Sequence, residues 1–232
     1  MKESAATAQV NTHPLPGHVK KSHGRSAVGA ALALCLVVLG VVLEGSSATF
    51  DQATLAASKA MEAKLQILNS KDAQPSGSYP AVVVTMYEAN SYLKVHSSEF
   101  LPKGVNPPWL TVQPEHVVAA TDVDFDVLSR SYPNPNDMGP KILAAMFHGS
   151  QHVAVTARIQ SQSAGVLVQI ESVVVGSMTV PSWLVDLMIQ KVLQPRYNFD
   201  LSKPLPYPDH VRQVVLGSGQ VTFLRGPKAK GQ

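Results

Sequence analysis

Charged side chains are scarce in this chain of 232 residues. Asp, Glu, Lys and Arg make up 15% of it, against about 25% in an ordinary soluble protein, whereas apolar residues make up 45%. The formal net charge is +3, and the basic excess lies at the two ends, so that the middle is close to neutral. The middle also lacks a Lys/Arg run interleaved with aromatic residues, and we therefore expect no nucleic acid among its partners.

Cysteine is almost absent as well. The single cysteine, Cys35, excludes a disulfide within the chain and every metal site built from several cysteines. A protein exported from the cytoplasm does not require disulfides, so this absence leaves the cellular compartment open.

The motifs of common catalytic and cofactor sites are missing too. No Walker loop, dinucleotide-binding glycine fingerprint or Gly-x-Ser-x-Gly elbow occurs. His148 and His152 are four residues apart, but Gly149 interrupts the helix that a zinc site of this spacing needs. Three aspartates alternate along an expected strand, 116–126, and are interpreted as its solvated face. We therefore predict no catalytic residue, no metal, no cofactor and no enzyme activity.

A long apolar run is the clearest feature that is present. Ala27–Leu43 contains 17 residues without a charge, and as a helix they reach roughly 25 Å, the short end of a bilayer span. Lys20, Lys21 and Arg25 precede the run, and Glu44 follows it. Basic residues before the run place the N-terminus in the cytoplasm. We predict a single-pass protein of the cell membrane whose C-terminal domain is extracytoplasmic, or periplasmic.

The same run also suits a cleavable signal peptide, with Ser46 and Ala48 as small residues at a cut after Ala48. Residues 1–26 form a leader that is long for a signal peptide, whose whole length is usually about 15–30 residues. This favours an uncleaved signal anchor at 27–43. A buried helix of a cytosolic protein is the third alternative, and the charges on the two flanks speak against it.

The remaining chain divides by composition. Residues 1–26 are expected to be a disordered, basic cytoplasmic leader. Residues 44–79 are expected to form a helical stalk and linker, because Asp51 can cap a helix whose apolar residues recur at helical spacing. An extracytoplasmic domain follows over 80–225, and residues 226–232 form a flexible tail.

Alternating apolar and polar residues predict the strands of this domain, and a capping box at Thr85 and Glu88 predicts the start of a helix. Ser182–Leu193 has the pattern of a second, amphipathic helix. The expected fold class is α+β, with an N-terminal transmembrane helix and an antiparallel sheet packed against amphipathic helices. The expected strands are 81–85, Trp109–Gln113, His116–Asp126, Gln151–Gln160, Gly165–Val175, Val211–Leu216 and Gln220–Leu224.

The amphipathic helix and the central hairpin suggest a place for an apolar ligand. The helix carries aromatic and flexible apolar side chains, which can line a groove against the apolar face of the hairpin. The alternative is that these side chains form an ordinary core. The candidate groove residues are Trp183, Leu184, Leu187 and Met188 from the helix and Val153, Val155, Val168 and Ile170 from the hairpin.

The order of several short motifs resembles a diffuse group of bacterial membrane-anchored extracytoplasmic proteins, many of them uncharacterised. The chain is also similar to LmeA-like proteins and, more distantly, to tubular lipid-binding (TULIP) domains of the synaptotagmin-like mitochondrial lipid-binding (SMP) type. The resemblance implies a curved sheet around a long helix, with lipid or another apolar molecule in the groove, although this chain is short enough to be a single module. The motifs are VTMYEANSYL (Val84–Leu93), LPKGV (Leu101–Val105), IESVVVG (Ile170–Gly176) and QPRYNFDLSKPLPYP (Gln194–Pro208).

Two functions are therefore expected. The first is a membrane-anchored, non-catalytic module that binds lipid or another apolar ligand. The second is an envelope protein that interacts with another envelope protein, or assists its assembly, through a solid core without a ligand. The membrane is a partner in both cases, and the space between the sheet and the Ser182–Leu193 helix distinguishes them.

Overall fold

The structure is a computed structural model that describes residues 50–70, 79–131, 145–190 and 200–227. The expected leader (1–26), the expected anchor (27–43) and most of the expected tail (226–232) lie outside these ranges. Within them, no helix is both long enough and apolar enough to cross a bilayer.

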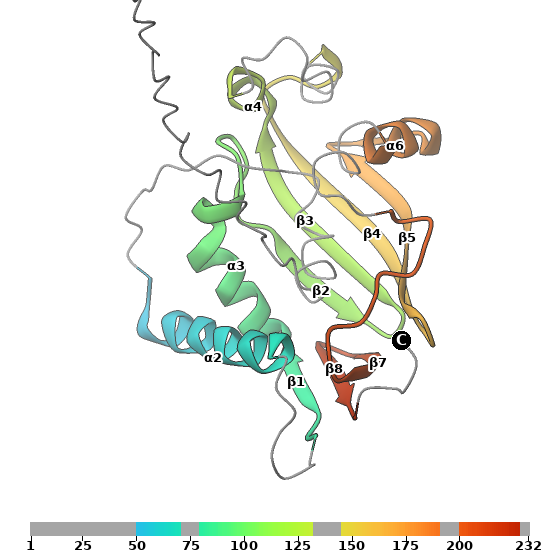
Figure 1. The fold of residues 1–232 in the computed structure, drawn as a ribbon. Coiled ribbons are helices and arrows are strands. Elements are labelled where there is room, and N and C mark those ends of the chain that lie inside the picture. Colours follow the sequence, from blue (N-terminus) through green and yellow to red (C-terminus); the bar gives the residue numbers. More distant parts are fainter. Residues whose placement is uncertain (1–49, 71–78, 132–144, 191–199, 228–232) are drawn as a thin grey trace, which may run out of the picture.

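The described chain has the α+β architecture expected from the sequence, with two antiparallel sheets and several helices (Figure 1). The larger sheet has five strands in the order β2-β3-β4-β5-β6, and the smaller has three in the order β1-β8-β7. The sequence did not indicate this division into two sheets. The strands are β1 (Val82–Thr85), β2 (Trp109–Gln113), β3 (His116–Asp124), β4 (Ser150–Gln162), β5 (Gly165–Val175), β6 (Met178–Thr179), β7 (Val211–Gly217) and β8 (Gln220–Arg225).

Two helices pack together at one end of the larger sheet. Helix α2 spans Gln52–Asn69 and starts at Asp51, whose carboxylate accepts a hydrogen bond from the Thr54 N–H at 2.8 Å. Helix α3 spans Met86–Phe100 and starts with the predicted capping box of Thr85 and Glu88. Each cap supplies an acceptor for an N–H that a helix start would otherwise leave unpaired.

The sequence predicts a helical stalk and linker over residues 44–79. Helix α2 lies in this range, and it packs in the core of the folded domain. Met61 and Leu68 of α2 are fully buried, and they join Leu93 of α3 in a core that also includes both sheets. The folded domain therefore includes α2, which lies before residue 80, the start of the domain expected from the sequence.

Strand β3 ends earlier than its alternating pattern suggested. The carboxylate of Asp124 accepts hydrogen bonds from the N–H groups of Asp126 and Val127, and this cap starts helix α4 (Phe125–Arg130). Phe125 then turns into a second core cluster with Phe147. Asp126 is therefore the first-turn acid of a helix and not part of a strand face.

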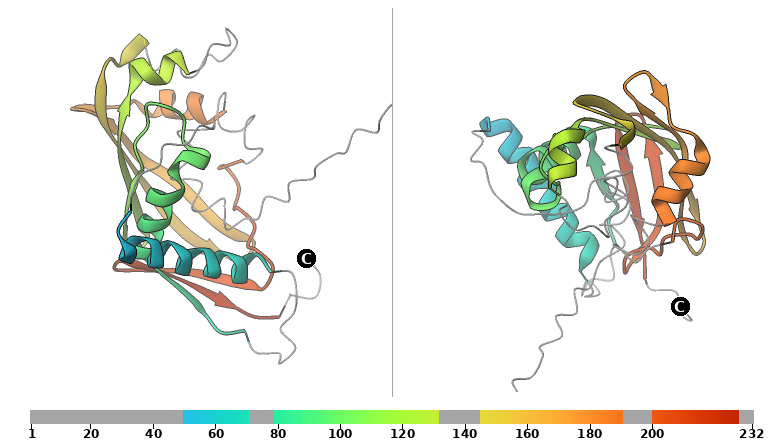
Figure 2. Two further views of the ribbon diagram at one scale, coloured as in Figure 1. Left: turned by 90° about the vertical axis from the view of Figure 1, so that its left-hand side faces the viewer. Right: turned by 90° about the horizontal axis from the view of Figure 1, so that it is seen from above.

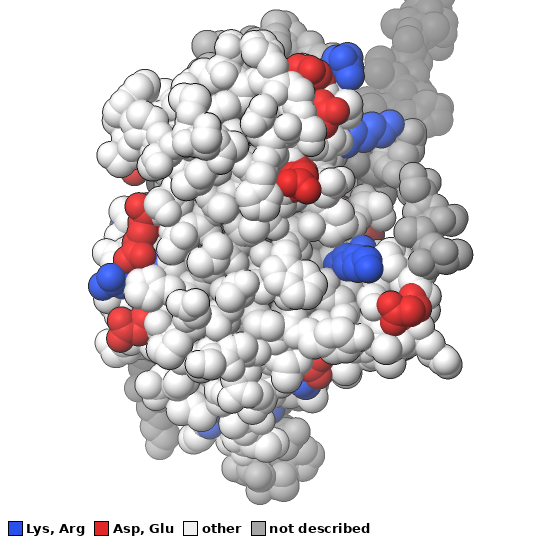
Figure 3. Space-filling view, turned by 180° about the vertical axis from the view of Figure 1, so that it is seen from behind, with Lys and Arg blue, Asp and Glu red and all other residues white. Residues whose placement is uncertain are grey.

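All helices that face the larger sheet lie on one side of it (Figure 2). Helix α3 covers one end beside β2, α2 packs on α3 and on β1 of the smaller sheet, and the short helix α6 (Ser182–Met188) lies over the other end beside β5. The opposite face of the sheet carries no described helix and few charged side chains (Figure 3). The concave side is thus filled at one end by α3, and α6 borders a space at the other end.

Asn90 of α3 joins the helix to the larger sheet, and its substitution is expected to weaken the fold. Its amide donates to the Leu110 carbonyl at 2.9 Å, and its oxygen accepts from the Leu110 N–H at 2.7 Å, both away from water. Asn90→Ala should lower the free energy of unfolding by roughly 2–4 kcal/mol, because two buried backbone groups lose their partners. Chemical denaturation followed by circular dichroism measures this, and the exposed Asn69→Ala is the matched control. Equal stability of the two variants would contradict the prediction.

Glu88 is expected to make stability depend on pH. Burial by itself would raise the pKa of Glu88, but hydrogen bonds from Lys64 and from Thr85 outweigh burial and hold the pKa below the ordinary 4.5. A lowered pKa in the folded state stabilises the protein above pH 4.5, and this stabilisation is lost as the pH falls through the folded-state pKa.

Glu88→Gln should therefore lower the free energy of unfolding at pH 7 by about 1–2 kcal/mol and flatten its fall in acid. The measurement is urea denaturation at a series of pH values. Glu115→Gln, in the turn between β2 and β3, is the control and should behave as the wild type. An acid dependence that is identical in Glu88→Gln and wild type would rule out this role.

Candidate functional site: a groove beside strand β5

An open groove lies between β5 and α6. Its volume is about 480 Å³, and the turn at Leu201 and Ser202 closes its third side. The space that the sequence left undecided is therefore a groove and not a packed core. Its apolar lining consists of Val168, Ile170, Val173, Val180, Pro181, Val185, Ile189 and Leu201, and its polar lining of Gln169, Glu171, Ser172, Thr179, Ser182, Asp186, Gln190 and Ser202.

The groove exists because β5 is much longer than the strand beside it. Strand β6 pairs only with Val174 and Val175, and the Val180 N–H donates to the Val173 carbonyl at 2.8 Å. At the other end Val166 and Leu205 exchange two backbone hydrogen bonds of 2.8 Å. Between these closures, the edge of β5 that faces away from β4 has no neighbouring strand over 167–173 in the described part of the chain, so side chains of both faces border the groove.

A bulge in β5 sets the polar wall of the groove. Thr156 of β4 pairs with Ser172, but the next residue, Ala157, pairs with Ile170, which leaves Glu171 as the extra residue. The Glu171 carboxylate accepts from Arg158 Nε at 2.8 Å and lies 3.2 Å from His116 Nε2. These contacts hold its charge at the border of the groove and away from the apolar residues.

Helix α6 faces the groove with one side only. Val185 and Ile189 are four residues apart and thus lie one above the other, as do Ser182 and Asp186. The helix has no side-chain cap, and it begins directly after Pro181. Proline cannot donate a backbone hydrogen bond, which suits it to the first turn of a helix at this border.

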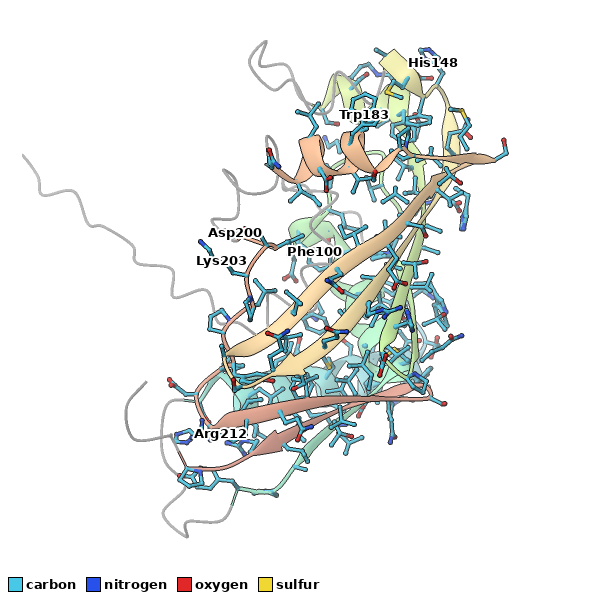
Figure 4. The ribbon with its side chains drawn as sticks, turned by 90° about the vertical axis from the view of Figure 1, so that its right-hand side faces the viewer. Phe100, His148, Trp183, Asp200, Lys203 and Arg212 are labelled. Atoms are coloured by element: carbon cyan, nitrogen blue, oxygen red, sulfur yellow. The ribbon has the colours of Figure 1, made fainter. Side chains whose placement is uncertain are left out.

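The third side is a tight turn. The Asp200 carboxylate accepts from the Ser202 N–H at 3.0 Å and from its hydroxyl at 2.6 Å, and the Lys203 ammonium lies 3.1 Å away. Hydrogen bonds from Ser202 are the main cause that lowers the pKa of Asp200, and Lys203 adds to them. Figure 4 shows Asp200 and Lys203 on the chain that runs from this turn toward β7.

The structure brings together two of the eight residues that the sequence suggested. Val168 and Ile170 line the groove. From the helix, Trp183 is 66% exposed on the side away from β5 (Figure 4), Leu184 is only 2% exposed in the interior, and Leu187 is half-buried. The Met188 side chain lies outside the described part of the structure.

The two remaining hairpin residues lie elsewhere on the sheet. Val153 belongs to the second core cluster, and Val155 is half-buried opposite Val173. Sequence reasoning also missed Val185, which lines the groove together with Ile189. Their spacing of four residues was visible, but the helix has apolar residues on more than one side, and the sequence alone does not say which side meets β5.

A second, smaller cavity lies inside the main core. Its volume is about 70 Å³, and apolar side chains of both sheets and α3 surround it, among them Leu110, Ile159, Val214 and Phe223. Ligand pockets usually have about 300–1,000 Å³, so this space is a packing defect too small for a lipid chain. The groove is the better candidate site.

The described lining of the groove combines apolar side chains with hydroxyl, amide and carboxylate groups. The described residues contain no group of three metal-ligating side chains, and the groove itself is lined by no histidine or cysteine. No model of a known protein family matches the sequence, and none of the curated proteins matches it either.

Trp183 provides a direct test of which side of α6 faces the groove. In a Trp109→Phe background Trp183 is the only tryptophan, and its fluorescence should have the emission of a solvated indole and full access to acrylamide. The reciprocal variant, Trp183→Phe, leaves Trp109, which is also exposed and serves as the comparison. Emission typical of a buried indole from Trp183 would contradict this orientation.

Proposed function

We propose that this protein binds a lipid acyl chain, or an apolar ligand of similar shape, in the groove between β5 and α6. The observation that supports the proposal is the open groove between β5 and α6, because the alternative was a solid core at this place. Its volume of about 480 Å³ falls within the usual range for small-molecule sites, about 300–1,000 Å³.

The distribution of side chains in the groove suits an amphiphilic ligand. Ile170 and Val173 on the sheet and Val185 and Ile189 on the helix offer apolar surface to a chain. Val168 borders the groove from the core and is only 2% exposed. Glu171 and Asp186 also border the groove and would keep a charged or hydroxylated end near water. No catalytic step is part of this proposal.

The expected membrane anchor makes lipid the nearest apolar ligand. If residues 27–43 span the cell membrane with the N-terminus in the cytoplasm, only 44–51 separate the bilayer from α2. Eight residues reach at most about 28 Å, so the folded domain would stay close to the outer surface of the bilayer. The anchor and the extracytoplasmic location are part of this proposal.

The open edge of β5 supports a second candidate, the binding of an extended segment of another envelope protein. Backbone groups of alternate residues point the same way, so Val168 and Ile170 present theirs in the direction of Leu205, toward the groove. An exposed edge of this kind can accept an added strand. The polar half of the groove lining is compatible with either occupant.

A photoreactive fatty acid tests the first candidate. The full-length chain is reconstituted in phospholipid vesicles that contain a diazirine fatty acid, and labelled peptides are identified by mass spectrometry. Labelling is expected on 168–173 and 182–190 in addition to the anchor. Val185→Asp should abolish the labelling of 168–173 and 182–190, because the new carboxylate places a charge in the apolar half of the groove. Val215→Asp, at an exposed position on β7, should leave this labelling unchanged. Labelling confined to the anchor would overturn the proposal.

The same assay separates the two candidates with Ile170→Pro. Proline removes the N–H that faces the groove and leaves the pairing with β4, so fatty-acid labelling should persist. Loss of a crosslinked protein partner in this variant, with no fatty-acid labelling in the wild type, would favour strand addition instead.

A further inference from the structure

Two arginines on the smaller sheet have no carboxylate partner among the described residues. Arg212 of β7 and Arg225 of β8 form no ion pair within the described part of the chain. Arg212 Nη2 and Arg225 Nε and Nη1 are shielded from solvent, and none of them donates a hydrogen bond. Both side chains are nevertheless partly exposed as a whole, so a solute can approach them.

The backbone places the two arginines next to each other. Arg225 is the strand partner of Val211, and the pairing shifts between Val211 and Gln213, so Arg212 is the extra residue of a bulge. The side chain of Arg212 packs on Gly226, where a Cβ would lie 3.3 Å from the Arg212 Cγ. Any larger residue at Gly226 would compete with Arg212 for this position.

An aromatic pair completes the site. The Arg225 guanidinium lies 5.9 Å from the centre of the Tyr79 ring, and this ring stacks on His210 at 5.0 Å. His210 is only 6% exposed, its Nδ1 is without a hydrogen bond, and its backbone has a φ of 66°. Side chains other than glycine adopt this conformation at a cost, so the contacts around His210 must hold it there.

Unpaired groups of this kind are costly. A buried donor without an acceptor destabilises a protein, and it does so more strongly if it is charged. Two like charges on neighbouring strands add repulsion. An anion bound at the solvent-exposed part of both guanidinium groups would offset the repulsion between them, and the planar arginine fork suits phosphate and carboxylate oxygens.

We propose that Arg212, Arg225 and His210, with Tyr79 beside them, form a binding site for the oxyanion of a phosphate group. The phosphate can come from a free phosphate compound or from a phospholipid headgroup. The site is separate from the groove: Figure 4 shows Arg212 at the opposite end of the 200–210 segment from Asp200. The inference therefore stands whether or not the groove binds a lipid.

Inorganic phosphate is the first probe. The full-length chain in a zwitterionic detergent is titrated with phosphate against chloride of equal ionic strength, and binding is followed by thermal stability and by ³¹P line broadening. The wild type should bind phosphate saturably. Arg212→Gln and Arg225→Gln should each weaken binding about tenfold or more, since each removes a charged hydrogen bond. No saturable binding, or unchanged binding in both variants, would overturn the proposal.

Arg158→Gln is the matched control. It removes the same charge from β4, where Arg158 is already paired with Glu171, and should leave phosphate binding unchanged. Equal weakening by Arg158→Gln would show that only net charge matters, and would also overturn the site.

A second measurement needs no variant. Phenylglyoxal modifies arginine side chains, and mass spectrometry reports which ones. Phosphate should protect Arg212 and Arg225 in the wild type and leave Arg158 as reactive as before. Equal modification with and without phosphate contradicts the proposal, even if the glutamine variants fail to fold.

Phosphatidic acid in mixed micelles with the same detergent distinguishes the two sources. If it displaces inorganic phosphate, and only when Arg212 and Arg225 are present, the site takes a lipid headgroup. If it does not, while inorganic phosphate still binds, the site takes a soluble phosphate compound. Both results support the site.

Discussion

Leu93 of α3 is fully buried where the helix meets both sheets, and the arrangement of the domain depends on this contact. Asn90, one turn earlier, fastens the helix to β2 through both polar backbone groups of Leu110. The turn of the β7–β8 hairpin contacts both α3 and β2. The Gly219 carbonyl accepts a hydrogen bond from the Met86 N–H, and the Gly219 N–H donates to the Val112 carbonyl. One helix thus aligns two sheets that share no strand.

The position of α3 also explains where the groove is. The core cluster around α3 takes up one end of the concave side of the larger sheet, and the second cluster, with Phe125 and Phe147, fills the end near α4. In β5, Val168 belongs to the first cluster and Val175 to the second, whereas Ile170 and Val173 between them belong to neither. Since β6 is only two residues long, nothing in the described chain pairs with the middle of the β5 edge that faces away from β4, and α6 leaves a space beside it. An open edge next to an apolar helix face is a natural place for a ligand or an added strand.

Local signals predicted the elements of the fold well. The capping box at Thr85 and Glu88, the cap at Asp51 and the central hairpin are confirmed, because each depends on residues close together in the sequence. Strand β3 was predicted too long, since Asp124 can end a strand by capping a helix as readily as it can occupy a solvated face. The helix expected within 44–79 is present as α2, but its packing in the core was not foreseen, because a helix does not reveal what its apolar side packs against. Of the candidate groove residues, Val168 and Ile170 were placed correctly and Trp183 and Leu184 were not.

The sequence by itself determined the α+β class, the helix starts, the hairpins and the apolar run at 27–43, because these follow from neighbouring residues and their periodicity. The tertiary structure alone decided that the strands divide into two sheets, that the bulge at Glu171 places a carboxylate at the groove border, and that Val185 and Ile189 face β5. It also brought Arg212, Arg225 and Tyr79 together. Strand pairing and helix docking join residues far apart in the chain, and which pairs form depends on the packing of the whole domain rather than on any local pattern.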